Sequence, residues 1–430
     1  MDRYKERRAE LIKKIKEDYA PADGVLLFIA DTENERNPFL QESTFYYFTG
    51  ISEPGVMLLV DLYGNETLYI PHFNSRREQW VRDPLLCDEK TAKRYGLKEI
   101  EYLGGSVEGY TFPLLCEREH VDVIAGKLKE IVGLNGSIYT PQSSNPLRYV
   151  KQKVLLERLK HWVDGLEDAL KDTSSIIASM RRTKSKYEIE QLYRAIDLTI
   201  LAHQNAAMTI GEDMRECEIQ AGIKYIFREA GEYPAFPSIV ATGKNSTILH
   251  YEPQVTMMKK GELAVVDIGA MHNHYCADLT RTYPVAGAFT KRQREVYNVV
   301  LATQEYIASI AAPGYWLNNK NEPDKSLHHC AVKFLTDKGF GQYISHGIGH
   351  FLGLDVHDVG DASMPLREGD VITIEPGVYI PEEQIGIRIE DDYWIIKDGS
   401  LCLSENLPRE ADDIEEAMHV TLEELEESSS

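Results

Sequence analysis

Four acidic residues and one histidine lie in stretches of this 430-residue chain that are otherwise apolar. These residues are Asp267, Asp278, His350, Glu375 and Glu390. The acids interrupt the segments ELAVVDIGA, YCADLTRTYPV, DVITIEPGVYI and IGIRIEDDYWII, which alternate as β-strands do. A carboxylate removed from water is costly unless a proton or a cation neutralises it. Oxygen ligands with one imidazole and no thiolate predict a pair of divalent ions such as Mn, Fe, Co or Zn.

A hairpin is expected to position the first two acids. The sequence MHNH separates them, and a turn centred on His272 and Asn273 would place Asp267 directly opposite Asp278. Like charges directly opposite each other destabilise a β-ladder, so this arrangement requires a neutralising partner.

A second hairpin repeats the pattern. A turn at residues 381–384 would place Glu375 opposite Glu390. A single acid in a strand is more often a solvated edge residue or a turn former than a metal ligand. Two mirrored pairs of acids in apolar strands argue against that simpler interpretation and favour the metal site.

Several motifs carry a resemblance to a known family. The segments VVDIGAMHNHYCADLTRTYPV, SHGIGHFLGLDVHD, ITIEPGVYI and GIRIEDD resemble the Xaa-Pro aminopeptidase (aminopeptidase P) and prolidase branch of the pita-bread metallopeptidases. NSTILHYEP and STFYYFTGISEPG extend the resemblance over nearly the whole chain. It implies a dinuclear metalloprotease that hydrolyses the N-terminal Xaa-Pro bond of peptides through a metal-bridging hydroxide. Mn²⁺ is the expected ion, with Co²⁺ or Zn²⁺ as alternatives.

The resemblance also implies roles for the acids and the histidine. It places Asp267 on one metal, makes Asp278 and Glu390 bridge both metals, and completes the second metal with His350 and Glu375. Glu375 is also expected to accept the proton of the nucleophile.

Four further residues match positions that line the substrate site of the family: His250, His346, His357 and Arg388. Of these, His250, His357 and Arg388 join Glu375 as the expected catalytic group. His357 is suited to donate to the tetrahedral oxygen or to the leaving proline nitrogen, although without the resemblance it could be an ordinary surface histidine. Arg388 precedes Glu390 by two residues and shares its strand face, where a guanidinium could orient a carboxylate ligand.

The chain divides into three parts by composition. Residues 1–172 alternate strand-like and helix-like segments and resemble the N-terminal creatinase/aminopeptidase P-like domain of the family, a mixed sheet with helices. Residues 173–418 are expected to form the pita-bread catalytic domain, a curved antiparallel sheet backed by helices. Residues 419–430 form an acidic tail. The expected fold class is therefore α+β.

Composition limits the partners. A net charge of −22 argues against nucleic acid, and no apolar run is long enough for a membrane span. Six scattered cysteines without a CxxC motif predict free thiols and a cytoplasmic protein. The expected partners are peptides with proline at the second position, and analogy with the family predicts a homodimer or a higher homo-oligomer.

Two other functions are compatible with the sequence. An Xaa-Pro dipeptidase (prolidase) would share the same metal motifs, because the metals perform the same chemistry. A non-catalytic binding protein could share the pita-bread fold, but it would have no need of the five ligand positions present here.

Overall fold

The computed structural model describes residues 2–33, 38–82, 84–145 and 148–419. The described residues form two compact units, which are divided between Met180 and Arg181. Apart from His419, the predicted acidic tail lies outside the described residues. All six cysteines are free, as predicted. Within the described part of the chain, no helix is long and apolar enough to cross a bilayer.

The first unit is built on a six-stranded mixed sheet with the order β4-β3-β2-β1-β5-β6. Its strands are β1 (Gly24–Ile29), β2 (Met57–Asp61), β3 (Glu66–Ile70), β4 (Glu99–Tyr102), β5 (Ser137–Thr140) and β6 (Leu170–Asp172). The pairs β1–β2 and β2–β3 are antiparallel, whereas β1–β5, β3–β4 and β5–β6 are parallel. The predicted mixed sheet of the N-terminal region is confirmed.

Helices accompany this sheet: α1 (Asp2–Asp18), α2 (Ser43–Thr49), α3 (Glu89–Tyr95), α4 (Asp122–Gly133), α5 (Val150–Trp162) and α6 (Leu166–Ala169). Helix α7 (Ser174–Arg182) contains the division between the two units, so its last two residues belong to the second unit. Leu11 and Ile15 lie one turn apart on α1 and are fully buried, as the period of the sequence predicts. On the same helix, Arg8 forms a buried bidentate pair with Glu66, with Nε and Nη2 at 2.9 and 2.8 Å from the carboxylate oxygens.

The second unit contains antiparallel strands. In its first half, β8 (Ile239–Thr242), β9 (Leu263–Ile268) and β12 (Leu279–Pro284) form one sheet, and β7 (Tyr233–Pro234), β10 (Ala270–His272) and β11 (Tyr275–Cys276) form another. In its second half, β13 (Val371–Ile374), β16 (Asp391–Ile396) and β17 (Gly399–Cys402) pair together, and β14 (Gly377–Ile380) pairs with β15 (Ile385–Arg388).

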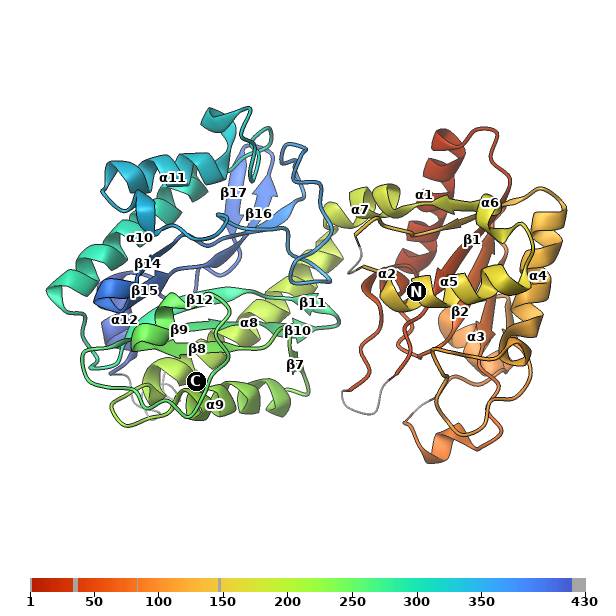
Figure 1. Cartoon of the computed structure of the whole chain (residues 1–430), viewed down its shortest axis with the longest axis horizontal. Coiled ribbons are helices and arrows are strands. Elements are labelled where there is room, and N and C mark those ends of the chain that lie inside the picture. The colour runs from red at the N-terminus through yellow and green to blue at the C-terminus, as the bar shows by residue number, and fades with distance from the viewer. Residues whose placement is uncertain (1, 34–37, 83, 146–147, 420–430) are drawn as a thin grey trace. The chain divides into compact units, whose positions relative to one another are not determined.

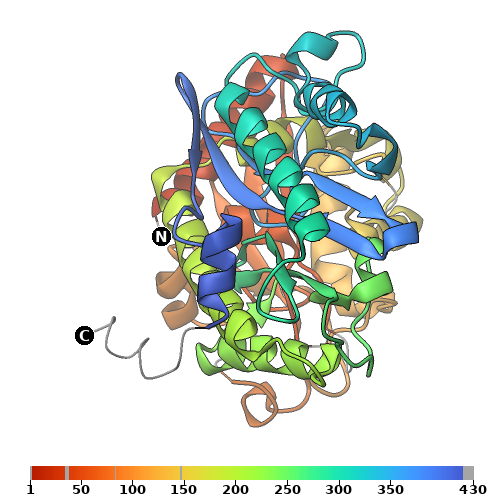
Figure 2. The same ribbon diagram turned by 90° about the vertical axis from the view of Figure 1, so that its left-hand side faces the viewer.

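Helices back these strands in the second unit: α8 (Lys186–Thr209), α9 (Glu216–Glu229), α10 (Lys291–Ile310), α11 (Leu327–Asp337) and α12 (Ala411–Ala417). Helix α8 contacts β10 and β12, α9 contacts β7 and β8, and α10 contacts β14, β15 and β17 (Figures 1 and 2). One core joins side chains from these helices and from β9, β14 and β15. Antiparallel strands backed by helices agree with the predicted α+β class.

The register of the first hairpin differs from the prediction. Asp267 pairs with Thr280, so the prediction that it lies directly opposite Asp278 is wrong by two residues. The turn is centred on Asn273 and His274, one residue further along than predicted, with φ angles of 47° and 70°. Two successive positive φ angles suit a tight hairpin turn, and asparagine adopts them more easily than most residues. Asp278 therefore lies diagonally across the hairpin from Asp267.

A glycine allows this hairpin to close. A Cβ atom added at Gly269 would collide with the carbonyl oxygen of Ala277 on the opposite chain segment. The amide of Ala277 in turn donates to the carbonyl of Ala270 at 3.0 Å. The close approach of the two segments next to Asp267 therefore depends on the missing side chain.

The second hairpin follows the predicted register. The pairs Gly377–Arg388 and Ile374–Asp391 flank the two acids, and their numbering places Glu375 and Glu390 at equivalent positions.

A seam joins the two hairpins. Thr280 and Glu390 form an isolated antiparallel bridge, in which the amide of Glu390 donates to Thr280 at 3.1 Å. Beside it, the fully buried guanidinium of Arg281 donates to the carbonyl of Glu390 and to the carboxylate of Asp391, each at 2.8 Å. The seam brings the acidic positions of both hairpins into one region of the second unit.

Candidate metal centre

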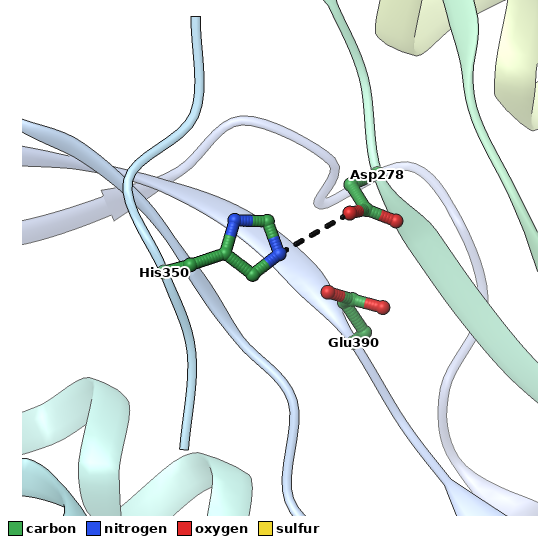
Figure 3. Close-up of side chains that lie close together, drawn as sticks. All are labelled: Asp278, His350 and Glu390. Carbon is green, nitrogen blue, oxygen red and sulfur yellow. Dashed lines mark ion pairs between the residues drawn. The ribbon is translucent and has the colours of Figure 1, made fainter. Parts of the chain in front are cut away.

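Three of the predicted ligands converge closely. Asp278, His350 and Glu390 each offer a ligand atom, and these atoms lie within 4.8 Å of one another (Figure 3). Asp278 immediately precedes β12, Glu390 lies between β15 and β16, and His350 comes from the segment before β13. Asp278 and Glu390 are 5% and 2% exposed, so the group is largely withdrawn from water.

The imidazole of His350 is oriented towards the carboxylates. Its Nε2 lies 3.3 Å from Asp278 Oδ2 and 3.8 Å from Glu375 Oε1. Its Nδ1 lies 3.1 Å from the carbonyl of Phe351, which can only accept a hydrogen bond. A proton on Nδ1 leaves Nε2 of the neutral ring with its lone pair facing the acids, the orientation that metal-binding histidines adopt.

The electrostatics of the group favour a bound cation. Burial, together with repulsion from Asp267, raises the pKa of Asp278 to about 6. Burial, together with repulsion from Asp278 and Asp267, raises the pKa of Glu375 to about 7. Burial and the other acids also raise the pKa of Glu390 well above its ordinary value. Although burial opposes it, hydrogen bonding to Asp278 raises the pKa of His350 to about 9.

An oxygen of Asp267 also favours a bound cation. Asp267 is 8% exposed and its Oδ2 accepts from Arg388 Nη2 at 2.7 Å. Its Oδ1 is buried and has no hydrogen-bond partner among the described residues. A buried carboxylate oxygen without a donor is costly, and a divalent cation satisfies it. The residues therefore fit divalent metal ions held by oxygen and imidazole ligands.

Arg388 occupies the position predicted for a group that orients a ligand. Besides Asp267, its guanidinium donates to the hydroxyl of Tyr379 at 2.7 Å and to Thr280 Oγ1 at 3.2 Å. Thr280 Oγ1 donates in turn to Glu390 Oε2 at 2.7 Å. Thr280 and Tyr379 were not predicted from the sequence. Each is an even number of residues from a predicted ligand on its segment, which places it on the same strand face.

His346 completes a chain of hydrogen bonds from Arg388. Its Nδ1 lies 2.8 Å from the carbonyl of Gly347, and its Nε2 lies 2.8 Å from the hydroxyl of Tyr379. Burial and the charge of Arg388 lower the pKa of His346 to about 4, so its ring is neutral near pH 7. His346 Nδ1 also lies 3.6 Å from Glu375 Oε2, which places the residue at the edge of the acidic group.

The remaining two histidines differ in their placement. The ring of His357 is exposed and lies edge-on to His350, with the ring centroids 4.2 Å apart. His250 is exposed and lies just after the short 3₁₀ helix Gly243–Thr247. No hydrogen bond or ion pair of the described residues connects His250 to the acidic group.

Asp392 is a further buried acid that the sequence did not single out. Its Oδ2 accepts from the amide of Asp278 at 3.3 Å, whereas its Oδ1 is buried without a hydrogen-bond partner in the described part of the chain. Burial and Asp278 raise its pKa well above the ordinary value. Its place in the consecutive acids of GIRIEDD was the available signal.

Comparison with known families agrees with this geometry. Residues 190–397 match metallopeptidase family M24, and residues 4–109 match the aminopeptidase P N-terminal domain. The first match contains all five predicted metal ligands and lies within the second unit.

Relatives of two activities resemble the chain over most of its length. It is 31% identical to the Xaa-Pro aminopeptidase of Haemophilus influenzae, and the alignment covers 97% of each chain. It is also 31% identical to the Xaa-Pro dipeptidase of Pyrococcus furiosus, over 89% of this chain and 97% of the relative.

Solved structures of aminopeptidase P also resemble the chain. An Escherichia coli aminopeptidase P variant in complex with substrate superposes with a TM-score of 0.79 at 27% identity, covering 97% of this chain and 98% of the other. The zinc-substituted E. coli enzyme in complex with product superposes with a TM-score of 0.78 at 26% identity. The chain belongs to metallopeptidase family M24 and combines its pita-bread catalytic domain with an aminopeptidase P N-terminal domain.

Proposed function

We propose that this protein is a metal-dependent Xaa-Pro aminopeptidase, which hydrolyses the N-terminal Xaa-Pro bond of peptides. The observation that carries the proposal is the convergence of buried carboxylates on the imidazole of His350. The proposed ligands of two divalent ions are Asp267, Asp278, His350, Glu375 and Glu390. Such ions would activate water and polarise the scissile carbonyl.

Glu375 is the proposed general base. Its pKa of about 7 suits a group that accepts and returns protons near neutral pH. It is more accessible than its neighbours, with 18% of its side chain exposed against 7% for Asp278. Glu375 is therefore the acid of the group that a substrate can reach most easily.

His357 is the proposed donor to the substrate. Its exposed ring lies against His350 at the edge of the acidic group. The nitrogen of the departing proline must be protonated, because an amide anion is a poor leaving group. We assign His250 and His346 to substrate binding, and Arg388 to holding Asp267 in place.

Selection of proline is proposed to depend on shape. Proline has no N–H and a fixed φ, so the chain bends at this residue and offers no donor there. Substrates of this class are peptides with proline at the second position, as the names of the aminopeptidase relatives state for those enzymes.

The alternative activity is that of an Xaa-Pro dipeptidase. The resemblance to the Pyrococcus dipeptidases favours it. Against it, the turn between β14 and β15 spans only Pro381–Glu383 and Gln384, so no long insertion there brings a basic group to read a substrate carboxylate.

Substrate length distinguishes the two activities. The test compares kcat/KM for Ala-Pro and Ala-Pro-Ala with Mn²⁺-loaded enzyme. We expect the tripeptide to be hydrolysed at least as well as the dipeptide. A preference of about a hundredfold for the dipeptide, or about 2.7 kcal/mol in transition-state binding, would establish a dipeptidase instead.

Three further properties belong to this proposal. Mn²⁺ is the proposed ion, with Co²⁺ or Zn²⁺ as alternatives, because the donors are oxygens and one imidazole. A homodimer is proposed by analogy with the family, and a cytoplasmic location is proposed from the six free thiols. Exhaustive chelation followed by elemental analysis tests the metal requirement, since full activity without metal would exclude the mechanism.

A further inference from the structure

We propose that Arg181 is a positioning residue for His357, acting through the two aspartates that flank this histidine. The proposal rests on the proposed function, in which His357 donates to the substrate. Arg181 lies in the last turn of α7, and its side chain is 1% exposed. It belongs to the same compact unit as the metal centre.

One nitrogen of Arg181 holds both aspartates. Its Nη2 lies 2.9 Å from Asp355 Oδ2 and 2.5 Å from Asp358 Oδ1. Asp355 precedes His357 by two residues and Asp358 follows it by one. The backbone that carries the exposed histidine is therefore held on both sides by the same buried cation.

Lys184 strengthens the attachment at Asp358. Its Nζ lies 3.1 Å from Asp358 Oδ2, so the carboxylate receives one cation on each oxygen. Both side chains of this pair are 1% exposed. Burial opposes the charge of Asp358, but Arg181 and Lys184 hold the pKa of its carboxyl below the ordinary value. This carboxylate is charged throughout the pH range in which the enzyme is expected to work.

The loop is shaped to receive this carboxylate. The amide of Asp358 donates to the carbonyl of Phe351 at 2.9 Å and closes the loop into a compact turn. A Cβ atom added at Gly353 would collide with Asp358 Oδ2 and approach Lys184 Cε at 3.0 Å. The glycine in the sequence GLDVHD thus leaves the space that the ion pair occupies.

The ion pairs of Arg181 bear on catalysis because they hold the backbone that carries His357 close to His350. The ring of His357 lies 4.2 Å, centroid to centroid, from the ring of His350. A displacement of about 1 Å in a group that transfers a proton can cost about a hundredfold in rate. The backbone on either side of His357 carries this ring, so a shift of that backbone moves the ring relative to His350. Weakening the ion pairs should therefore lower turnover without removing the metals.

The experiment is a double-mutant cycle between Arg181→Lys and His357→Ala, with kcat, KM and metal content measured for each variant. We expect Arg181→Lys alone to lower kcat about tenfold or more, with KM changed less than about threefold and the metals retained. In the His357→Ala background, the same substitution should change kcat less than about twofold, because the group it positions is already absent.

Arg8→Lys is the matched control. Arg8 forms a bidentate pair with Glu66 that is comparably buried, with exposed fractions of 5% and 6%. This substitution should lower the melting temperature by an amount similar to that of Arg181→Lys and leave kcat unchanged. The comparison separates a general loss of stability from a loss of positioning.

A second variant covers the case in which Arg181→Lys does not fold. Asp355→Asn removes the charge of the more exposed partner of Arg181 and should behave in the cycle as Arg181→Lys does; the side chain of Asp355 is 38% exposed. Equal losses of kcat with and without His357 would overturn the proposal and leave the proposed function intact. Failure of the parent enzyme to cleave any Xaa-Pro peptide would instead reject the proposed function.

Discussion

Arg388 and Asp267 come from different hairpins, and a 2.7 Å hydrogen bond joins guanidinium Nη2 to carboxylate Oδ2. The bond occupies one oxygen of Asp267 and leaves Oδ1 without a hydrogen-bond partner among the described residues. The fixed guanidinium thus determines which oxygen is available for a metal ion. Arg388 would thus orient the proposed ligand Asp267 without being a ligand itself.

Arg388→Lys tests this relationship. Lysine cannot reproduce the bonds to Asp267, Tyr379 and Thr280, because its ammonium is compact and lacks the planar fork of arginine. We expect metal affinity to fall about 10- to 100-fold, measured by calorimetric titration of metal-free protein with Mn²⁺. Arg292→Lys, which alters an exposed pair with Glu383, is the control. Unchanged affinity for Arg388→Lys would show that Asp267 needs no orienting partner.

Glu375→Gln should lose several orders of magnitude in kcat. The change removes a charged ligand and the proposed base but keeps the size of the side chain. Turnover is measured at saturating Mn²⁺, and the melting temperature of the metal-free variant serves as the folding control. Retention of even a tenth of the parent turnover would assign the base to another residue.

His357→Ala should separate binding from turnover. The residue lies beside His350 but outside the group of converging ligand atoms, so both metals should remain bound. We expect kcat to fall about 100-fold or more, as is typical when a general acid is removed. Metal content by elemental analysis is the decisive measurement, and loss of metal would move His357 into the ligand set.

The stabilising effect of metal should increase with pH. Burial raises the pKa of Asp278 to about 6 and that of Glu375 to about 7. Hydrogen bonding to Asp278 raises the pKa of His350 to about 9 despite burial. Raised values mean that the folded metal-free protein binds these protons more tightly than the unfolded chain. This contribution to stability is complete below the unfolded pKa values and is lost as pH rises through the folded ones.

Metal replaces those protons as pH rises. We expect the melting temperature of chelated protein to fall between about pH 5 and pH 9, and the increase on adding Mn²⁺ to be larger at pH 8 than at pH 5.5. Differential scanning calorimetry with and without Mn²⁺ at each pH measures both trends. An increase that is constant across this range would contradict the raised pKa values.

Gly269→Ala should destabilise the first hairpin. The added methyl would collide with the carbonyl of Ala277, which is backbone and cannot rotate away. We expect a loss of about 1–3 kcal/mol in the free energy of unfolding, determined in urea. Gly399→Ala is the control, because a Cβ there meets no atom within 4 Å. Equal effects of both substitutions would exclude close strand approach as the cause.

The sequence singled out the acids that the structure brings near His350, because buried carboxylates in apolar strands are unusual enough to recognise. It also predicted the register of the second hairpin, where the turn begins with a proline. The register of the first hairpin could not be obtained in this way. The sequence MHNH allows turns centred at adjacent positions, and a shift of the centre by one residue moves the pairing of Asp267 by two.

Contacts between segments that are far apart in the sequence also could not be predicted. The alternation of strand residues indicates that Thr280 and Tyr379 share a face with the acids, but it does not show which partner they meet. The pairing of Thr280 with Glu390 depends on the packing of two hairpins that are separated by more than a hundred residues. The ion pairs of Arg181 join residues still further apart in the sequence. Asp355 lies 174 residues from Arg181, and Asp358 lies 177 residues from it.

The seam between the hairpins has a consequence for the choice of ion. Glu390 is anchored to Thr280 by a backbone bridge and by a hydroxyl bond of 2.7 Å, so its position cannot easily adjust to the radius of the bound cation. Glu375 lies on the short connection between β13 and β14, and its carboxylate makes longer contacts, at 3.6 Å to His346 and 3.8 Å to His350. We therefore expect an ion of different size to be accommodated mainly on that side. Exchange of one metal for another would then alter the placement of the proposed base, and we expect catalytic rate to be a more sensitive reporter of metal identity than binding affinity.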